Sequence, residues 1–81
     1  MNPEMTTDPN QYATIDSLLC QALAQLGDRI PSVDRLNISE YLDHGEYGVA
    51  YELLVFVIDR EHITWPESLG EAGAAMGLRT K

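Results

Sequence analysis

Hydrophobic residues recur every three or four positions along most of this chain, and each such run predicts an amphipathic helix. The first predicted helix starts at Asp8-Pro9, where an aspartate can cap a helix and a proline fits its first turn, and it ends at Gly27. Its expected inward residues are Tyr12, Ile15, Leu19, Ala22, Leu23 and Leu26. Residues 1–7 are expected to form a flexible tail.

Two further helices are predicted in the middle of the chain. The second is expected to be capped by Ser32, after a turn at Ile30-Pro31, and its inward residues are Val33, Leu36, Ile38, Tyr41 and Leu42. The third runs from about Gly45 to Glu61, and its apolar positions cover an arc of roughly 200°, so we expect it to be the central helix. Its expected inward residues are Val49, Ala50, Leu53, Leu54, Phe56, Val57 and Ile58. Its outward residues are Gly48, Tyr51, Glu52, Val55 and Asp59.

A fourth helix is predicted after a link at His62-Ile63. Thr64 and Glu67 have the spacing of a capping box, and the expected inward residues are Trp65, Leu69, Ala72 and Met76. No segment carries a β-hairpin signal. The sequence therefore predicts an all-α fold, a small bundle of about four helices that forms a single domain over residues 1–81.

The charge of the chain narrows the choice of partner. Thirteen Asp and Glu residues against five Lys and Arg residues give a formal net charge of −8. Such a chain repels the phosphate backbone, so we expect no direct binding to nucleic acid, and it attracts a basic protein instead. The longest apolar run is far shorter than a membrane span, and the amino-terminal residues show no export signal. We therefore expect no membrane partner and a cytoplasmic protein.

No residue pattern in the sequence indicates catalysis, a metal or a cofactor. His44 stands between Asp43 and Glu46, but neither His62 nor Cys20 supplies the paired spacing of a zinc site. No serine lies in a Gly-x-Ser-x-Gly elbow. Cys20, the single cysteine, is expected to be a small, partly buried hydrophobic residue in a reducing compartment. We therefore expect no catalytic residue, no metal and no cofactor, and a protein that is not an enzyme.

The stretch LDHGEYGVAYELL, residues 42–54, permits two interpretations that are compatible with each other. Asp43 and Glu46 stand three positions apart before an apolar run, which is the capping-box pattern for the third helix. In that position Glu46 would meet the positive end of the helix dipole. The same carboxylates could instead contact a partner.

Capping does not explain the charge of the longer segment between Leu36 and Asp59, which contains no Lys or Arg. A typical solvated surface mixes both signs. An acidic face kept for solubility is one explanation. A contact surface is the other, because tyrosines, which are favoured at protein interfaces, lie among these carboxylates. The residues predicted to bind a partner are Glu40, Asp43, Glu46, Tyr47, Tyr51, Glu52 and Asp59.

A short match links the chain to acyl carrier proteins. Asp16-Ser17-Leu18 reproduces their Asp-Ser-Leu tripeptide, in which the serine carries phosphopantetheine at the start of the second helix. Here Ser17 falls inside the first predicted helix, and a match of three residues is weak. An acyl-carrier-like protein remains an alternative function, as does a helical interaction or oligomerisation module.

A longer match lies in the run YLDHGEYGVAYELL, residues 41–54. This run resembles the signature segment of MafI-type immunity proteins, in which a short helix ends in an acidic hGE turn and leads into yglAxExL. The likeness continues through Val57-Ile58 and through the Ile-Thr-x-x-Glu entry to the last helix, Ile63 to Glu67, and it covers about half of the chain. The resemblance implies a cognate immunity protein of a bacterial polymorphic toxin system, which binds a toxin domain in the cytoplasm of the producing cell.

The toxin domains of such systems are often nucleases, and nucleases tend to be basic because they bind phosphates. The expected partner is therefore a basic toxin domain. The expected mechanism is stoichiometric occlusion, in which the acidic face covers the surface that would bind nucleic acid.

Overall fold

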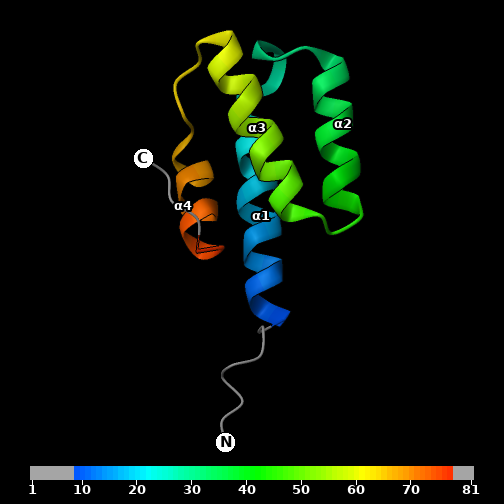
Figure 1. Ribbon diagram of the computed structural model, residues 1–81, viewed down its shortest axis with the longest axis vertical. Coiled ribbons are helices and arrows are strands. Elements are labelled where there is room, and N and C mark those ends of the chain that lie inside the picture. Colours follow the sequence, from blue (N-terminus) through cyan, green and yellow to red (C-terminus); the bar gives the residue numbers. More distant parts are fainter. Residues whose placement is uncertain (1–8, 78–81) are drawn as a thin grey trace, which may run out of the picture.

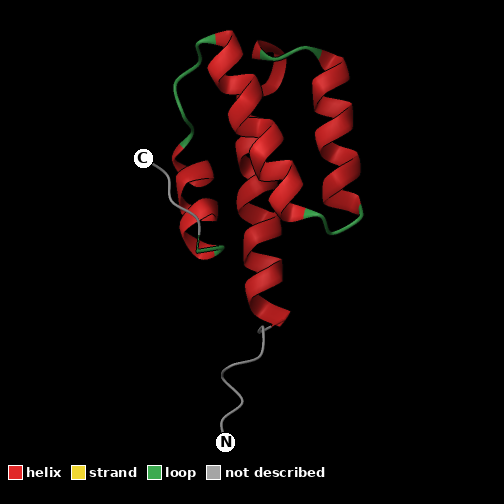
Figure 2. Ribbon diagram, viewed as in Figure 1, coloured by secondary structure: helices red, strands yellow, loops and turns green. Residues whose placement is uncertain are grey.

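The computed structural model describes residues 9–77, and most of this range is helical (Figure 1). Its four α-helices in that range are α1 (Pro9–Leu26), α2 (Ser32–Asp43), α3 (Tyr47–Glu61) and α4 (Glu67–Ala75), with a 3₁₀ turn, η2 (Gly27–Arg29), after α1. Figure 2 shows helices and connecting loops, and the described part of the chain contains no strand. The predicted all-α bundle is confirmed. The predicted tail at residues 1–7 and the cap at Asp8 lie outside the described residues.

The helices pack as two main pairs. α4 lies along α1, and α2 lies along α3, while α3 crosses α1 (Figure 1). Both α1 and α3 contact every other helix, so the central position predicted for α3 is shared with α1. α2 stands at one edge of the bundle and contacts α3 more than α1 (Figure 1).

α1 follows its sequence pattern closely. Its residues Ile15, Leu19, Ala22 and Leu26 are buried, at the spacing of one helical face. Leu23 is half-buried at the margin of that face, and Tyr12, predicted to point inward, is 49% exposed.

A single core holds the four helices together. Fully burying a Val, Leu, Ile or Phe side chain contributes about 1.5–3 kcal/mol, so the large buried residues dominate the stability. The largest fully buried side chains are Leu19, Leu26, Ile38, Leu54, Ile58, Leu69 and Val57.

The predicted Ser32 cap is wrong. Ser32 is already part of α2, and the cap position belongs to Pro31, with no capping side-chain hydrogen bond. The carbonyl oxygen of Pro31 accepts the backbone N–H groups of Asp34 and Arg35, each at 3.1 Å. Because the ring of Pro31 fixes its φ at −59°, the helix can start without help from a side chain.

The predicted inward face of α2 is correct only for Ile38 and Leu42, which are buried. Val33, Leu36 and Tyr41 are 60%, 66% and 38% exposed, so these three assignments are wrong. The reason is that α2 meets the rest of the molecule mainly through α3, and one neighbouring helix covers only a narrow stripe.

The faces of α3 also differ from the prediction. Val49 and Phe56, expected inside, are 42% and 60% exposed, whereas Tyr51, expected outside, is only 5% exposed. The ring of Tyr51 meets the ring of Trp65 edge to face, with centroids 6.4 Å apart. Trp65 lies in the segment before α4. Because it packs on Tyr51, the buried face of α3 includes Tyr51. The buried residues of α3 are Ala50, Tyr51, Leu54, Val57 and Ile58.

α4 packs as predicted but starts differently. Leu69 and Ala72 are buried, and the half-buried Trp65 and Met76 pack against the core. The predicted capping box is wrong, because no side-chain hydrogen bond caps α4 and the cap position is Pro66. Among residues 9–77, no helix is both long enough and apolar enough to cross a membrane.

Candidate functional site

The turn between α2 and α3 places several of the predicted partner-binding residues. Gly45 adopts a φ of +72°, a conformation that glycine adopts without strain, and it reverses the chain. The N–H of Gly45 donates to the carbonyl of Leu42 at 3.0 Å, and the N–H of Glu46 donates to the carbonyl of Tyr41 at 2.9 Å. These paired bonds form a Schellman motif, so backbone groups alone close the end of α2.

The predicted capping box at this turn is wrong. Asp43 is the last residue of α2, and Glu46 caps α3 through its backbone carbonyl, which accepts the N–H of Ala50 at 3.0 Å. No side-chain hydrogen bond forms at the start of α3. Asp43 and Glu46 are exposed, and their carboxylates make none of the hydrogen bonds that close the turn. Helix capping therefore does not explain their negative charge.

Five exposed carboxylates follow α2, the turn and α3. We call them the acidic surface: Glu40, Asp43, Glu46, Glu52 and Asp59. In the described part of the chain, none of the five forms an ion pair. Their negative charge is therefore not neutralised by an ion pair, and a folding role does not account for it.

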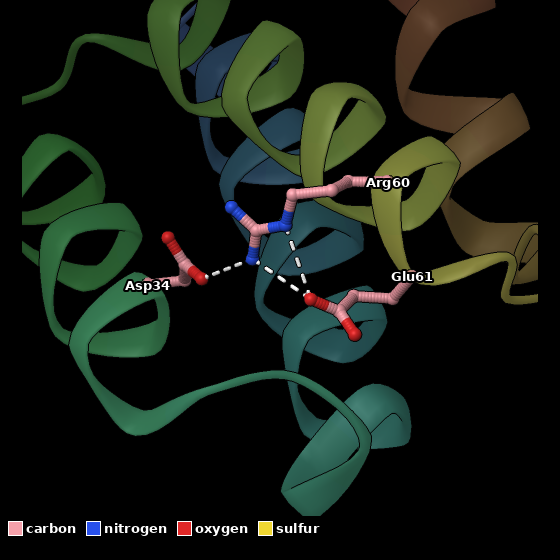
Figure 3. Close-up of polar contacts among 3 residues, drawn as sticks. All are labelled: Asp34, Arg60 and Glu61. Carbon is pink, nitrogen blue, oxygen red and sulfur yellow. Dashed lines mark hydrogen bonds and ion pairs between the residues drawn. The ribbon is translucent and has the colours of Figure 1, made fainter.

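The paired cations neutralise other carboxylates. Near the end of α3, the Arg60 guanidinium lies 2.7 Å from Asp34 of α2 and 3.0 Å from Glu61 (Figure 3). The hydrogen bond to Asp34, followed by that to Glu61, raises the pKa of Arg60. Arg35 similarly approaches Asp28, at 3.9 Å. These pairs join α2 to α3 and to η2, and they leave the acidic surface uncompensated.

Exposed apolar side chains accompany the carboxylates on α3. Val49 and Phe56 share the exposed side of this helix with Glu52, and the Arg60 guanidinium lies 5.7 Å from the centre of the Phe56 ring. Sequence reasoning missed Val49 and Phe56 because it assigned them to the core. The width of the apolar arc on α3 was the available signal, because neighbouring helices cannot cover so wide an arc in so small a chain.

The two tyrosines of the predicted site lie in different places. Tyr51 belongs to the core, so its predicted position on the contact surface is wrong. Tyr47 is half-buried at the start of α3, and its ring lies 6.2 Å from that of Tyr12. Burial, followed by the charge of Asp16, raises the pKa of Tyr47.

An open groove of about 930 Å³ separates α1 from α2. It is lined by Asp16, Cys20, Leu23, Ala24, Gly27, Ser32, Arg35, Leu36, Ser39, Leu42, Asp43 and Tyr47. Asp43 belongs to both the groove and the acidic surface, whereas Glu40 and Glu46 line a separate hollow. Of the predicted partner-binding residues, Asp43 and Tyr47 line this groove, while Glu52 and Asp59 lie on α3 away from it.

The side chains of Cys20 and His44 both lie close to oxygen atoms of neighbouring residues. The thiol of Cys20 lies 3.9 Å from a carboxylate oxygen of Asp16, and burial, followed by this carboxylate, raises its pKa. A protonated thiol is a weak nucleophile. The Nδ1 atom of His44 lies 2.7 Å from the carbonyl oxygen of Glu40. Within residues 9–77, no group of three or more His, Cys, Asp or Glu side chains is placed to hold a metal ion.

Comparison of the chain with protein-family models, with curated proteins and with solved structures finds no match. The chemistry of the surface and the resemblance in residues 41–54 are therefore the features that bear on function.

Proposed function

We propose that this chain is an immunity protein, which binds a cognate toxin domain in the cytoplasm of the producing cell and neutralises it by occlusion. The toxin domain is a basic protein, and a nuclease fits this description because enzymes that bind phosphates carry positive surfaces. The resemblance to MafI-type immunity proteins supports this function. The segment that carries the resemblance, residues 41–54, contributes three of the five residues of the acidic surface.

The observation that carries the proposal is the absence of ion pairs on the acidic surface in residues 9–77. Exposed carboxylates such as Glu52 and Asp59 lie on the outside of α3, where they can cap no helix. Negative charge that no ion pair neutralises, as on the acidic surface, accelerates the approach of a basic protein and disfavours binding of an acidic one.

The apolar residues beside these charges provide the second requirement of a stable interface. Phe56 exposes 60% of its surface and Val49 exposes 42%, and aromatic side chains are enriched at protein interfaces. A standard interface buries about 800 Å² on each partner. The chain exposes 5290 Å², so a contact of that size is compatible with its dimensions.

The proposed mechanism is competition for one surface of the toxin. The carboxylates of the acidic surface take the place of nucleic-acid phosphates against the basic residues of the toxin, and no covalent step is involved. Inhibition is then stoichiometric, with one molecule of this chain for each molecule of toxin.

Co-expression tests this function. The protein encoded by the adjacent upstream gene is expressed with and without this chain, and growth is measured. We expect the upstream product to arrest growth, this chain to restore it, and purified toxin to lose its activity at an equimolar ratio. Lack of rescue, or inactivation of many toxin molecules by one molecule of this chain, would contradict the proposal.

The intact mass of the purified chain distinguishes an immunity protein from an acyl-carrier-like protein. Ser17 lies in the middle of α1 rather than at a helix start. We therefore expect the mass to equal that of the unmodified sequence, whereas addition of phosphopantetheine at a serine would favour a carrier protein.

A further inference from the structure

The groove between α1 and α2 is a gap in the bundle. α2 packs inward through Ile38 and Leu42 and leans on α3, which leaves the stripe of α1 from Asp16 to Gly27 facing open space. Along α2 the groove extends from Ser32 to Asp43. At about 1.5 Å per residue, this stretch is about 16 Å long.

The dimensions of the groove match one face of an α-helix. A helix with a diameter of about 10 Å and a length of about 16 Å occupies about 1,300 Å³. The groove is open to solvent and has a volume of about 930 Å³, so a helix of roughly three turns could lie along it with one face inside. Helices that dock in this way place apolar residues at i, i+3, i+4 and i+7 against the groove.

Apolar side chains line the middle of the groove. Leu36 exposes 66% of its surface there, which the packing of the bundle does not explain, and Leu23 and Ala24 face it from α1. Covering an apolar side chain of this kind removes its surface from water, which is favourable. The groove therefore favours an apolar face on whatever fills it.

The charges at the two ends of the groove differ in sign. Asp16 and Asp43 both line the groove together with Cys20, and the Cys20 thiol lies 3.9 Å from a carboxylate oxygen of Asp16. Toward the other end, Arg35 lies beside Asp28. A complementary helix therefore carries its cationic residues at the end that meets Asp16 and Asp43.

We propose that the groove between α1 and α2 binds an amphipathic α-helix of the toxin, whose apolar face contacts Leu36 and whose lysine or arginine residues meet Asp16 and Asp43. This inference rests on the proposed function, because the basic toxin domain is the partner proposed there. Asp43 is the one residue of the acidic surface that lines this groove.

Two synthetic peptides provide the probe. Each is about 18 residues long, so that it can be helical, and each has the same leucine and alanine face. One carries lysines beside this face and the other carries glutamates. We expect the lysine peptide to bind saturably, to gain helicity by circular dichroism, and to shift amide resonances of α1 and α2 that border the groove. Absence of saturable binding, or equal binding of a lysine peptide broken by two prolines, would overturn the proposal.

Leu36→Glu and Val33→Glu form a matched pair of variants. Both residues are exposed on α2, but only Leu36 lines the groove. Each variant adds one negative charge, which by itself would strengthen binding of a cationic peptide. We expect Leu36→Glu to weaken binding about tenfold, as for an interface anchor, and Val33→Glu to leave it unchanged or slightly stronger. Equal affinities for both variants would show that the peptide binds by charge alone and would overturn the proposal.

The same variants are then tested against the toxin. If Leu36→Glu loses neutralisation while Val33→Glu retains it, the groove belongs to the toxin interface. If both variants neutralise as well as the unaltered chain, the groove proposal fails and the immunity function stands. Failure of the unaltered chain to neutralise any adjacent gene product would instead reject the function.

Discussion

His62 holds a backbone conformation that histidine rarely adopts. Its φ of 58° and ψ of 46° lie in the left-handed region, at the position that follows the last turn of α3. The N–H of His62 donates to the carbonyl of Asp59 at 3.3 Å, and the N–H of Ile63 donates to that of Ile58 at 3.0 Å. The helix end therefore has Schellman geometry with a histidine where glycine is usual.

Replacing His62 with glycine is expected to stabilise the fold. A left-handed conformation costs about 1–2 kcal/mol for most residues, and the extra freedom of glycine in the unfolded chain offsets about 0.5–1 kcal/mol of the gain. We expect His62→Gly to raise the free energy of unfolding in urea by about 0.5–1 kcal/mol. The reverse change, Gly45→Ala at a φ of +72°, should lower it. A His62→Gly variant that is less stable would show that the imidazole contributes to the fold.

The phenol of Tyr51 makes stability depend on pH. Burial raises the pKa of Tyr51 above its ordinary value of 10.0. The folded state therefore keeps the proton more tightly than the unfolded state does. Stability from this group is complete below about pH 10 and is lost as pH rises through the raised pKa. Urea unfolding between about pH 9 and pH 11.5 measures the loss, and we expect Tyr51→Phe to lose less stability over this range. Identical curves for both proteins would contradict the assignment of Tyr51 to the core.

At the scale of the helices, the sequence predicts which segments are helical better than it predicts which faces are buried. The spacing of apolar residues and the breaks at Gly27 and Pro31 locate the helices within a few residues. The faces depend on which neighbours cover them, and periodicity contains no information about neighbours. Within residues 9–77 no helix covers Phe56, which is 60% exposed, whereas Trp65 packs against Tyr51 and covers it.

The ends of the helices were harder to predict than their length. Asp43 with Glu46, and Thr64 with Glu67, have capping-box spacing, yet the helices that follow begin without a side-chain cap. Backbone conformation decided both cases, through the left-handed Gly45 and through proline at the cap of α4. As for the candidate site, its exposed charges followed from sequence, whereas the groove did not, because it arises from the angle between helices.

Substitutions in α3 test its packing. Leu54 is fully buried, whereas the adjacent Leu53 is only half-buried. We expect Leu54→Ala to lower the free energy of unfolding by about 2–5 kcal/mol, and Leu53→Ala to lower it by clearly less. Thermal melts and urea titrations of the two variants measure the difference. Equal losses, or a larger loss at Leu53, would show that the buried side of α3 is placed incorrectly.

At the scale of the whole molecule, the residues that stabilise the fold differ from those proposed to bind the toxin. The core joins the four helices, and Arg60 links α2 to α3, while the acidic surface contributes to neither. A net charge of −8 with these five carboxylates unpaired within residues 9–77 is a disadvantage for a small fold. The proposed function explains it, because the same charge speeds the capture of a basic toxin.

Charge reversal on α3 tests this account. Glu52→Lys with Asp59→Lys should change stability by only about 0.5 kcal/mol per site, as exposed substitutions usually do. The control is Glu67→Lys with Glu71→Lys on α4, where both residues are exposed. Both double variants change the net charge by the same amount, so any difference between them reports the position of the charge rather than its total.

The decisive measurement is the association rate with the cognate toxin, determined by stopped flow at low and at high salt. We expect the Glu52→Lys, Asp59→Lys variant to associate about tenfold or more slowly than the unaltered chain at low salt, with a flatter dependence on salt. The α4 control should stay close to the unaltered chain. If the α3 variant associates at the unaltered rate at both salt concentrations, α3 does not contribute its charge to recognition, and the central claim is wrong.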